Sequence, residues 1–429
     1  MTRTATFVRP LLPLVLLAGV LTGCSIVEPV DADSARTATG PITIWYSNNE
    51  QEVAWGEQVV SSWNAAHPDE PVKGQQIPTG KSSEAVIQAS IIAGTEPCLI
   101  YNTSPASVPS FQAIGGLVDL DQFPGGREYI EDRSGDLAAQ YRSPDGNYYQ
   151  LPWKSNPVQI FYNKAVFKKA GLDPDNPKLA SYADFLAAGK QIVASKAARY
   201  AIYPSAATDF FQSWFDFYPA YIAASDGKQL IEDGKATFDD EAGKQVFDFW
   251  RQIYAGGLAG QEVYNGDAFA DGTAAMATVG PWAINAYDKV DWGVVPVPTA
   301  DGTPSDYTFS DAKNVAMYAS CENRATAFDF LEYSTSEAQD GKFLELTGQM
   351  PTRTDVLGTY ADYFAKNPAY KTFADLAQGV VEVPNVPNSV QIWQAFRDAW
   401  AKNVIFGDGN VDAALRSAAT TVDGLVVKK

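Results

Sequence analysis

Ile42-Thr43-Ile44-Trp45-Tyr46-Ser47-Asn48-Asn49 is the first regular stretch of this chain and the starting point for its architecture. β-Branched and aromatic residues fill the first five positions, which predicts a strand, and the polar residues after them predict a turn. Residues 50–66 then place apolar side chains at helical spacing. A short apolar strand that runs into an amphipathic helix is the repeating unit of an α/β fold with a largely parallel sheet.

The same alternation continues along the chain. Residues 86–93 predict a helix and residues 99–102 a short strand, while 240–255 form an amphipathic helix before the predicted strand 290–297. The chain has 429 residues, of which 46% are hydrophobic and 12% aromatic, so it contains enough apolar material for more than one core. We therefore predict two α/β domains rather than one.

The N-terminus has the features of a secretory leader. Arg3 and Arg9 precede the apolar run 11–20, which is too short to cross a hydrocarbon core of about 30 Å as a helix. Leu21-Thr22-Gly23-Cys24 follows and resembles a bacterial lipobox. The resemblance implies cleavage before Cys24 and a lipid on its sulfur, which would anchor the mature protein to the outer face of the cell membrane. An ordinary secretory signal with a chance cysteine is the alternative.

Composition and charge exclude several classes of function. The net charge is −19 and becomes −21 once the leader, with two arginines and no acidic residues, is removed. A chain this acidic is repelled by nucleic acid. His67 is the only histidine, so zinc sites and histidine-based catalytic triads are not expected. Cys98 and Cys321 remain beside Cys24, and outside the cell these two can form a disulfide or stay as thiols.

A tethered hydrolase is the rival class of function. Paired carboxylates can hydrolyse glycosides, but with 51 acidic residues some pair is always close. No Gly-x-Ser-x-Gly motif is present, and Gly80-Lys81-Ser82 lacks the first P-loop glycine because Gln75 stands there. The run 173–177 lacks the loop glycine of a calcium site. We predict no catalytic residues, no metal and no cofactor, and keep a lipid-tethered glycoside hydrolase only as an alternative.

Short motifs follow one another in a fixed order along the mature chain. They are Gly115-Gly116-Leu117-Val118-Asp119-Leu120, Leu151-Pro152-Trp153, Phe161-Tyr162-Asn163-Lys164, Ala274-Ala275-Met276-Ala277, Gly280-Pro281-Trp282, Gly348-Gln349-Met350-Pro351 and Val383-Pro384-Asn385. Their order and spacing between residues 41 and 418 resemble the family 1 extracellular solute-binding proteins, the carbohydrate-capturing components of bacterial ABC importers. The chain departs from this family at Cys98, where an acidic residue is usual, and the first strand ends in no signature of one particular sugar.

The resemblance implies two α/β lobes joined by a hinge of crossing strands, with the ligand in the cleft between the lobes, near the carboxyl ends of their strands. Closure of the lobes around the ligand would be a hinge motion. The implied partners are a carbohydrate, a membrane permease and a separate ATPase, and we expect a monomer that binds no nucleic acid. The expected parts are a signal peptide at 1–23, a flexible tether at 24–40, a first lobe at 41–154 plus 312–350, and a second lobe at 155–311 plus 351–429.

The implied lobe also bears on the two remaining cysteines. In such a lobe, the strand after Cys98 lies beside the returning antiparallel strand that precedes Cys321. The resemblance therefore implies a Cys98–Cys321 disulfide, with two unpaired buried thiols as the alternative.

Candidate ligand contacts follow from the chemistry of sugars. A sugar ring has an apolar face that stacks on flat aromatic side chains, and hydroxyls that bond to carboxylates, amides and charged donors. Such side chains lie at the predicted strand ends and crossings: Tyr46, Asn48, Asn49, Tyr101, Asn102, Ser104, Trp153, Lys154, Asn156, Phe210, Trp214, Trp282, Asp311, Lys313 and Met350. Trp393 and Arg397 are four residues apart on one helix face. The family's Gly-Pro-Trp turn and its late helix supply stacking tryptophans, which favours Trp282 and Trp393 most.

Some of these assignments have open alternatives. The tryptophans Trp55, Trp63, Trp250 and Trp400 have helical spacing among apolar residues, which predicts core positions, and Trp45 fits a core or a cleft equally well. Lys154 and Lys313 can form salt bridges in the hinge or contact the ligand. If both lysines face the cleft, the ligand is an acidic sugar or a glycerol phosphodiester. Otherwise the number of aromatic residues available for stacking favours a neutral di- or oligosaccharide.

Overall fold

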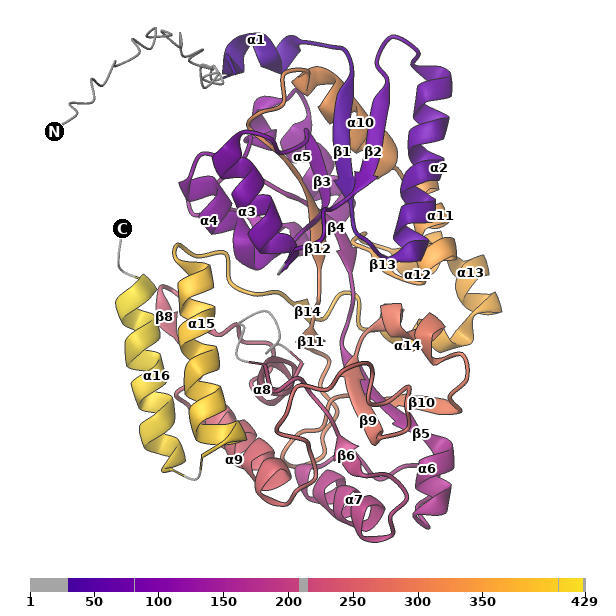
Figure 1. The fold of residues 1–429 in the computed structure, drawn as a ribbon, viewed down its shortest axis with the longest axis vertical. Coiled ribbons are helices and arrows are strands. Elements are labelled where there is room, and N and C mark those ends of the chain that lie inside the picture. The colour runs from indigo at the N-terminus through magenta and orange to yellow at the C-terminus, as the bar shows by residue number, and fades with distance from the viewer. Residues whose placement is uncertain (1–29, 81, 208–214, 408, 427–429) are drawn as a thin grey trace, which may run out of the picture.

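The computed structural model describes residues 30–80, 82–207, 215–407 and 409–426, and these residues form two lobes, one above the other in Figure 1. Each lobe is a mixed β-sheet covered by helices. The predicted two-lobed α/β fold is therefore confirmed. The lipobox residue Cys24 and the predicted contacts Phe210 and Trp214 lie outside the described residues.

The first lobe is built on a sheet with the strand order β13-β4-β12-β3-β1-β2. Its strands are β1 (Ile42–Tyr46), β2 (Val72–Gln76), β3 (Leu99–Thr103), β4 (Leu151–Ser155), β12 (Lys313–Met317) and β13 (Met350–Pro351). β2, β1 and β3 are parallel, whereas β12 pairs antiparallel with both β3 and β4, and β13 pairs antiparallel with β4. The sheet is therefore less parallel than predicted, because the returning strand β12 inserts between β3 and β4.

Helices cover both faces of this sheet (Figure 1). They are α1 (Ala32–Thr37), α2 (Glu50–Ala66), α3 (Ser83–Ala93), η1 (Pro105–Ser107), α4 (Val108–Ala113), η2 (Leu120–Gln122), α5 (Gly126–Ser134), η3 (Gly135–Tyr141), α10 (Arg324–Ser334) and α11 (Glu337–Thr347). The N-cap of α2 agrees with its sequence, since the Asn49 side chain accepts from the first-turn amides.

Helix α1 lies within the stretch for which the sequence predicts a flexible tether. Its residue Ala35 is buried, and the segment after the helix is fixed to α10, because the Ala325 amide donates to the Ala38 carbonyl at 3.1 Å. The Gly40 amide also donates to the Thr326 hydroxyl at 3.1 Å. Tertiary contacts of small residues, which composition does not reveal, order this segment against the first lobe.

The second lobe has a sheet with the strand order β10-β5-β9-β6. Its strands are β5 (Gln159–Asn163), β6 (Tyr200–Ile202), β9 (Ala274–Val279) and β10 (Trp292–Val295), and a small hairpin is formed by β7 (Ile231–Glu232) and β8 (Lys235–Ala236). The helices are α6 (Lys164–Lys169), α7 (Tyr182–Ala194), α8 (Phe217–Ala224), α9 (Glu241–Ala255), η5 (Pro281–Tyr287), α15 (Ser389–Trp400), the π-helical turn η6 (Ala401–Ile405) and α16 (Val411–Val426).

Three connections join the two lobes. The first runs directly from β4 to β5, and the second runs from β11 (Thr308–Phe309) to β12. The third leaves β13 through three short helices, α12 (Val356–Thr359), α13 (Ala361–Lys366) and α14 (Pro368–Ala374), and reaches β14 (Val380–Val381), which pairs parallel with β11. All three connections pass the boundary between the lobes, so relative motion of the lobes must be accommodated there.

Each lobe has its own hydrophobic core. Trp55 and Trp63 lie in the core of the first lobe, and Trp250 and Trp400 lie in that of the second. All four are at most 3% exposed, which confirms their predicted core positions. Trp45 is also buried, in a second cluster of the first lobe with Ile77 and Ile100, which settles its open alternative in favour of the core.

The two cysteines form a disulfide, as the resemblance implied. Cys98 precedes β3 and Cys321 follows β12, and the two residues are bonded. The Tyr318 amide donates to the Cys98 carbonyl at 2.9 Å, so the antiparallel pairing of β3 with β12 brings the cysteines together. The covalent bond fixes the returning strand to the sheet of the first lobe.

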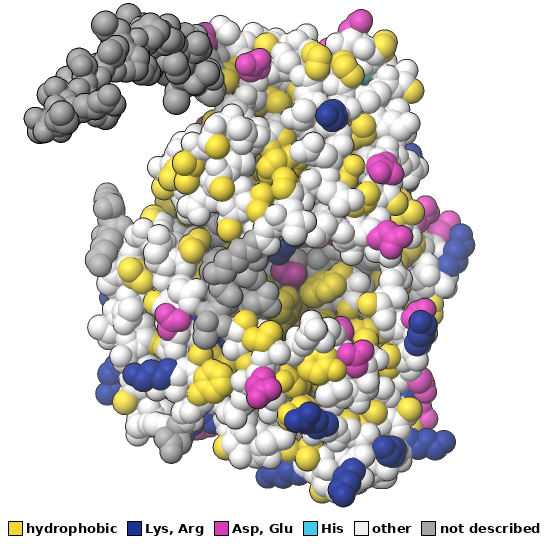
Figure 2. Space-filling model, viewed as in Figure 1, with side chains coloured by type: hydrophobic (Ala, Val, Ile, Leu, Met, Phe, Trp, Pro, Cys, Tyr) yellow, Lys and Arg dark blue, Asp and Glu magenta, His cyan; other side chains and the backbone are white. Residues whose placement is uncertain are grey.

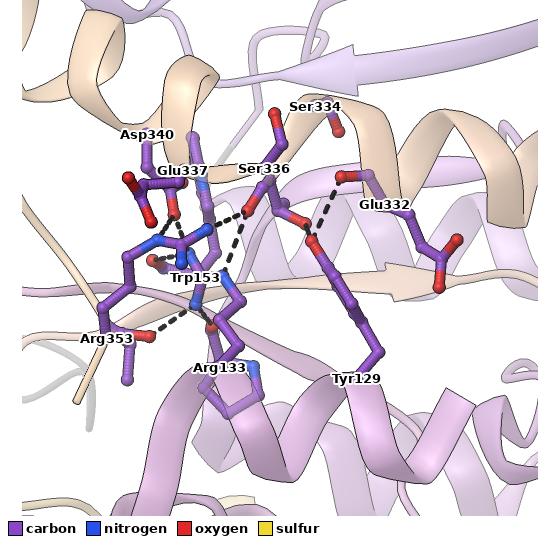
Figure 3. A network of polar contacts seen from close by, with 12 residues as sticks. Tyr129, Arg133, Trp153, Glu332, Ser334, Ser336, Glu337, Asp340 and Arg353 are labelled. Carbon is purple, nitrogen blue, oxygen red and sulfur yellow. Dashed lines mark hydrogen bonds and ion pairs between the residues drawn. The ribbon is translucent and has the colours of Figure 1, made fainter. Parts of the chain in front are cut away.

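A buried network fixes β4 and β13 to the first lobe (Figure 3). Arg133 of α5 donates to the Trp153 carbonyl at 3.1 Å and to the Thr352 carbonyl at 2.6 Å. Arg133 and Arg353 both bond to the carboxylate of Asp340 in α11, at 2.8 and 2.6 Å. One buried carboxylate thus holds two guanidinium groups, and that of Arg133 reaches the backbone beside two of the connections.

Candidate functional site

A hollow lies between the upper and lower halves of the molecule in Figure 2. On the first lobe, the loop of Ser47, Asn48 and Asn49 follows the carboxyl end of β1 and leads into α2. Asn49 caps α2 by accepting from the Gln51 and Glu52 amides at 3.0 and 3.1 Å, so its side chain is occupied by the helix. Asn48 is exposed, and of the two predicted asparagine contacts in this loop it is the more accessible one.

Lys154 lies in a buried ion pair with Glu52 rather than on an open surface. The ammonium contacts the Glu52 carboxylate, and Gln349 donates to the same carboxylate oxygen at 2.8 Å. Burial favours the neutral form of Glu52, but Lys154 and the hydrogen bonds from Gln349 and Ser47 together hold the pKa of Glu52 below its ordinary value. Of the two alternatives for Lys154, the structure selects a salt bridge.

The boundary between the lobes carries a second, more open ion pair. Lys313 bonds to Asp311 at 2.9 Å, and the side chains are 22% and 27% exposed. Although burial opposes it, the carboxylates of Asp311 and Glu84 raise the pKa of Lys313 above its usual value. Asn156 lies beside this pair, and its Nδ2 donates to the Asp311 carbonyl at 3.1 Å. Its buried Oδ1 has no hydrogen-bond partner among the described residues.

Three predicted aromatic contacts of the first lobe are buried in its core, which corrects the expectation that they face a ligand. Tyr101 and Trp153 are 0% exposed and pack against each other with ring centroids 5.2 Å apart. Tyr46 packs against Gly56 of α2 and Gly74 of β2, where a Cβ atom would come within 2.6 Å of its ring. These rings fill the space under the helices because strands buried on both faces alternate apolar side chains between two helix layers.

Asn102 and Ser104 follow β3 and are half-buried. Asn102 Nδ2 lies 3.4 Å from the Ser83 hydroxyl, at the start of α3. Both residues therefore lie at the carboxyl end of β3, and part of each side chain is accessible.

The second lobe has a cavity of about 480 Å³ at the carboxyl end of β6 and along β9. The β6 strand pairs with β9 only as far as Met276, and within the described residues no other strand covers 277–279 on that side. Thr278 lies at this free edge, and its buried hydroxyl has no partner among the described residues. Aromatic rings form much of the wall: Tyr203, Phe215, Tyr264, Phe269 and Tyr287.

Trp282 lies close to this cavity. The ring of Trp282 folds back over Gly280, where a Cβ atom would come within 2.1 Å of it, so the glycine of the Gly-Pro-Trp turn is required. Trp282 is half-buried and its ring centroid is 5.8 Å from that of Phe215. Phe215 also contacts Phe309 of β11, at 6.2 Å. The cavity wall is therefore continuous with the second connection, which leads to Asp311.

The remaining predicted contacts lie inside the protein, which corrects their expected roles. Trp393 is 1% exposed in the core of the second lobe, and Met350 is 0% exposed in the cluster under α12–α14. Arg397 is buried and donates to the carbonyls of Ser205 and Ala207, at 2.7 and 2.8 Å. It shapes the segment that lines the cavity rather than facing a ligand. Helical spacing shows that Trp393 and Arg397 lie on the same face of α15, but it does not show what covers that face.

Several cavity residues were missed by sequence reasoning. Tyr203 directly follows β6, so the strand-end argument used for other aromatic residues applies to it as well. Tyr264 and Phe269 belong to an irregular segment before β9, and no periodic pattern marks them. Glu52 was assigned only to a helix, although its position one turn after a polar strand end is a signal for a buried cap or ion pair.

In the described parts of the chain, no group of three or more histidine, cysteine or acidic side chains could hold a metal ion. No helix in the same parts has both the length and the apolar character needed to cross a membrane.

Comparison with known proteins agrees with this architecture. The family described as bacterial extracellular solute-binding proteins matches residues 58–372. The maltodextrin-binding protein MdxE of Bacillus subtilis is 22% identical over 308 residues, which cover 68% of this chain and 70% of that protein. The maltotriose-binding protein of Pyrococcus abyssi is 24% identical over 380 residues, covering 85% and 78%. The crystal structure of the cyclic alpha-maltosyl-1,6-maltose binding protein from Arthrobacter globiformis superposes with a TM-score of 0.75 at 22% identity, covering 90% and 99%.

Proposed function

We infer that this chain, which belongs to the family of bacterial extracellular solute-binding proteins, captures a neutral di- or oligosaccharide between its lobes and delivers it to the permease of an ABC importer. The cavity of the second lobe carries this proposal. Its aromatic wall offers flat apolar surfaces to sugar rings, and its polar edge offers hydrogen bonds to their hydroxyls. Two of the relatives are a maltodextrin-binding and a maltotriose-binding protein, which supports the same class of ligand.

The charges at the boundary favour a neutral ligand over an acidic one. Each of the two lysines considered for an anionic ligand has a carboxylate partner, Glu52 for Lys154 and Asp311 for Lys313. An anion would have to compete with these carboxylates, whereas a hydroxyl can donate to Asp311 and accept from Lys313 without breaking the pair. We keep the acidic sugar and the glycerol phosphodiester as the alternatives that a binding test must include.

The proposed ligand contacts come from both lobes. Trp282 and Phe215 provide stacking surfaces on the second lobe, and the Asp311–Lys313 pair provides polar contacts at the boundary. Asn48, Asn102 and Ser104 add polar groups on the first-lobe side: their side chains are at least partly accessible. We place the first lobe at 41–154 plus 312–350 and the second at 155–311 plus 351–429, so that the ligand lies at the boundary where a hinge motion would enclose it.

We also propose that the mature chain is held at the outer face of the cell membrane by a lipid on Cys24. The support is the leader sequence that ends in Leu21-Thr22-Gly23-Cys24. Mass spectrometry of the protein extracted from membranes tests this: a diacylglyceryl adduct on an N-terminal Cys24 peptide is expected, and an unmodified mature protein in the medium would contradict it.

A thermal-shift screen tests the proposed ligand class. A ligand that binds only the native state raises the free energy of unfolding by about 2.7 kcal/mol at a hundredfold excess over Kd. We expect an upward shift with neutral oligosaccharides such as maltotriose, and none with glucuronate-containing sugars or glycerol phosphodiesters. A shift with the acidic compounds alone would overturn the ligand class. Chromatography of the sugars after incubation distinguishes binding from hydrolysis, because a binding protein returns them unchanged.

A further inference from the structure

A chain of buried hydrogen bonds starts at Glu52, in the first turn of α2. Glu52 is 3% exposed. One of its carboxylate oxygens accepts from the Ser47 hydroxyl at 2.7 Å, and the other contacts the Lys154 ammonium and accepts from Gln349 Nε2 at 2.8 Å. Three segments that are far apart in the sequence therefore converge on one carboxylate: the end of β1, the end of β4 and the turn before β13.

The chain continues from Gln349 to the second connection between the lobes. Gln349 Oε1 accepts from Asn156 Nδ2 at 3.1 Å, and Asn156 Nδ2 also donates to the Asp311 carbonyl at 3.1 Å. Asn156 lies in the first connection, Asp311 in the second, and Gln349 directly before the strand that opens the third. The hydrogen bonds that begin at Glu52 thus reach all three routes between the lobes.

The same carboxylate also orders the loop between β1 and α2. The Ser47 hydroxyl, which donates to Glu52, accepts from the Asn49 amide at 3.1 Å. Exposed Asn48 lies between these two residues. The position of a proposed ligand contact and the positions of the connecting segments therefore depend on one buried side chain.

A buried carboxylate of this kind permits few arrangements. Removing a charge from water is expensive unless the charge is paired and its lone pairs are satisfied. Glu52 meets this requirement only when Ser47, Lys154 and Gln349 all occupy their present positions. A shift of Lys154 or Gln349 relative to α2 would break a charge-assisted hydrogen bond to Glu52. The network therefore favours one discrete arrangement of the boundary over a continuous range of arrangements.

We propose that Glu52 is a positioning residue that sets the relative orientation of the two lobes, by coupling the β1–α2 loop to the segments that connect them. The proposal deepens the proposed function, because lobe orientation determines how the cleft closes around its ligand. Glu52 does not itself touch the ligand. Its charge fixes the boundary in the ligand-free protein, and a ligand that contacts Asp311 or Asn48 acts on the two ends of this same network.

The test measures lobe separation without any ligand, so its outcome does not depend on which solute is bound. Spin labels on Glu128→Cys in α5 and Thr420→Cys in α16, both exposed positions, report the distance between the lobes by pulsed electron resonance. Cys24→Ser removes the third native cysteine, so that the two introduced cysteines are the only thiols beside the native Cys98–Cys321 disulfide. We expect Glu52→Gln to shift or broaden the distance distribution, because Lys154 loses its partner.

Two further variants separate positioning from stability. Val59→Ala removes a core side chain from the same helix α2 and should lower the melting temperature while leaving the distance distribution unchanged. Gln349→Leu keeps the Glu52–Lys154 pair but breaks the link to Asn156, so it tests the proposal even if Glu52→Gln does not fold. It should also broaden the distribution. An unchanged distribution in folded Glu52→Gln or Gln349→Leu protein, or an equal change in Val59→Ala, overturns the proposal.

A second readout connects the network to binding. Titration with maltotriose should give at least a fivefold change in Kd for Glu52→Gln relative to its parent, and less than a twofold change for Val59→Ala. If the parent itself does not bind maltotriose, that sugar is not the ligand and the distance measurement alone decides the role of Glu52. If the parent binds and the distances change without any change in Kd, lobe orientation does not control affinity, and that part of the proposal fails.

Discussion

The guanidinium of Arg397 lies 3.1 Å from the carboxylate of Asp216, and both side chains are completely buried in the second lobe. Trp400 donates to the same carboxylate oxygen at 2.8 Å. Arg397 also bonds to the carbonyls of Ser205 and Ala207. One arginine of α15 therefore holds Asp216 together with Ser205 and Ala207, two residues of the cavity wall.

Replacing Arg397 by methionine should destabilise the protein by about 3–5 kcal/mol, because it leaves the Asp216 carboxylate buried without a counter-charge. Chemical denaturation measures this loss. Arg416→Met, at an exposed arginine of α16, is the matched control and should change stability by less than about 0.5 kcal/mol. Equal stabilities of the two variants would show that the buried pair contributes nothing.

Trp282→Ala should weaken binding of the neutral oligosaccharide by at least about tenfold, or about 1.4 kcal/mol, with a small change in melting temperature. Trp282 is half-buried beside the cavity, so its removal takes away a stacking surface more than core packing. Trp393→Ala should instead cost about 3–5 kcal/mol of stability, since Trp393 is buried. Calorimetric titration and thermal unfolding of both variants separate the two roles. Parent-like binding by Trp282→Ala would remove this residue from the site.

The Cys98–Cys321 bond should stabilise the protein by about 2–4 kcal/mol. It joins residues 223 positions apart, so it restricts a long loop in the unfolded chain. The double variant Cys98→Ser with Cys321→Ser should unfold at lower denaturant concentration, and reducing agent should lower the midpoint of the parent but not that of the variant. Two reactive thiols in the unreduced, denatured mature protein would contradict the bond.

Glu382→Gln should stabilise the protein at neutral pH. Burial raises the pKa of Glu382 well above its ordinary value, and nearby Lys313 opposes this only in part. A carboxyl that stays protonated in the folded state but ionises near pH 4.3 when unfolded costs stability as the pH rises above that value. The gain of the variant should therefore grow from pH 4 to pH 7.

Melting temperatures across this pH range measure the effect. Glu128→Gln, at an exposed position of α5, serves as the control and should show no such growth. A gain that stays constant with pH would mean that Glu382 is ionised in the folded protein.

The architecture could be predicted from the sequence because it rests on local pattern. The strand at Ile42–Tyr46 and the helix at Glu50–Ala66 lie where apolar spacing places them. The antiparallel pairing of β12 with β3 was inferred from the family resemblance, and the disulfide follows from that pairing. The place of β12 next to β4 was not predicted. Helix α1 could not be predicted, because tertiary contacts rather than its own composition order it.

The candidate site was harder to predict because strand ends show which residues are near the boundary but not which way they point. Tyr101 and Asn102 are neighbours in β3, yet Tyr101 is buried in the core and Asn102 is partly accessible. The partner of Lys154 was also hidden, since Glu52 is 102 residues away in the sequence. The cavity aromatics Tyr264 and Phe269 belong to no regular element, so periodicity does not reveal them.

Calorimetric titration of the mature chain with glucose, maltose, maltotriose and maltotetraose tests the central claim most directly. We predict saturable binding of one ligand per chain, with affinity that rises from the monosaccharide to the oligosaccharides, because the proposed site would place successive rings against the aromatic wall and the Asp311–Lys313 pair. Absence of heat with every neutral sugar, together with saturable binding of a glucuronate-containing sugar or a glycerol phosphodiester, would contradict it.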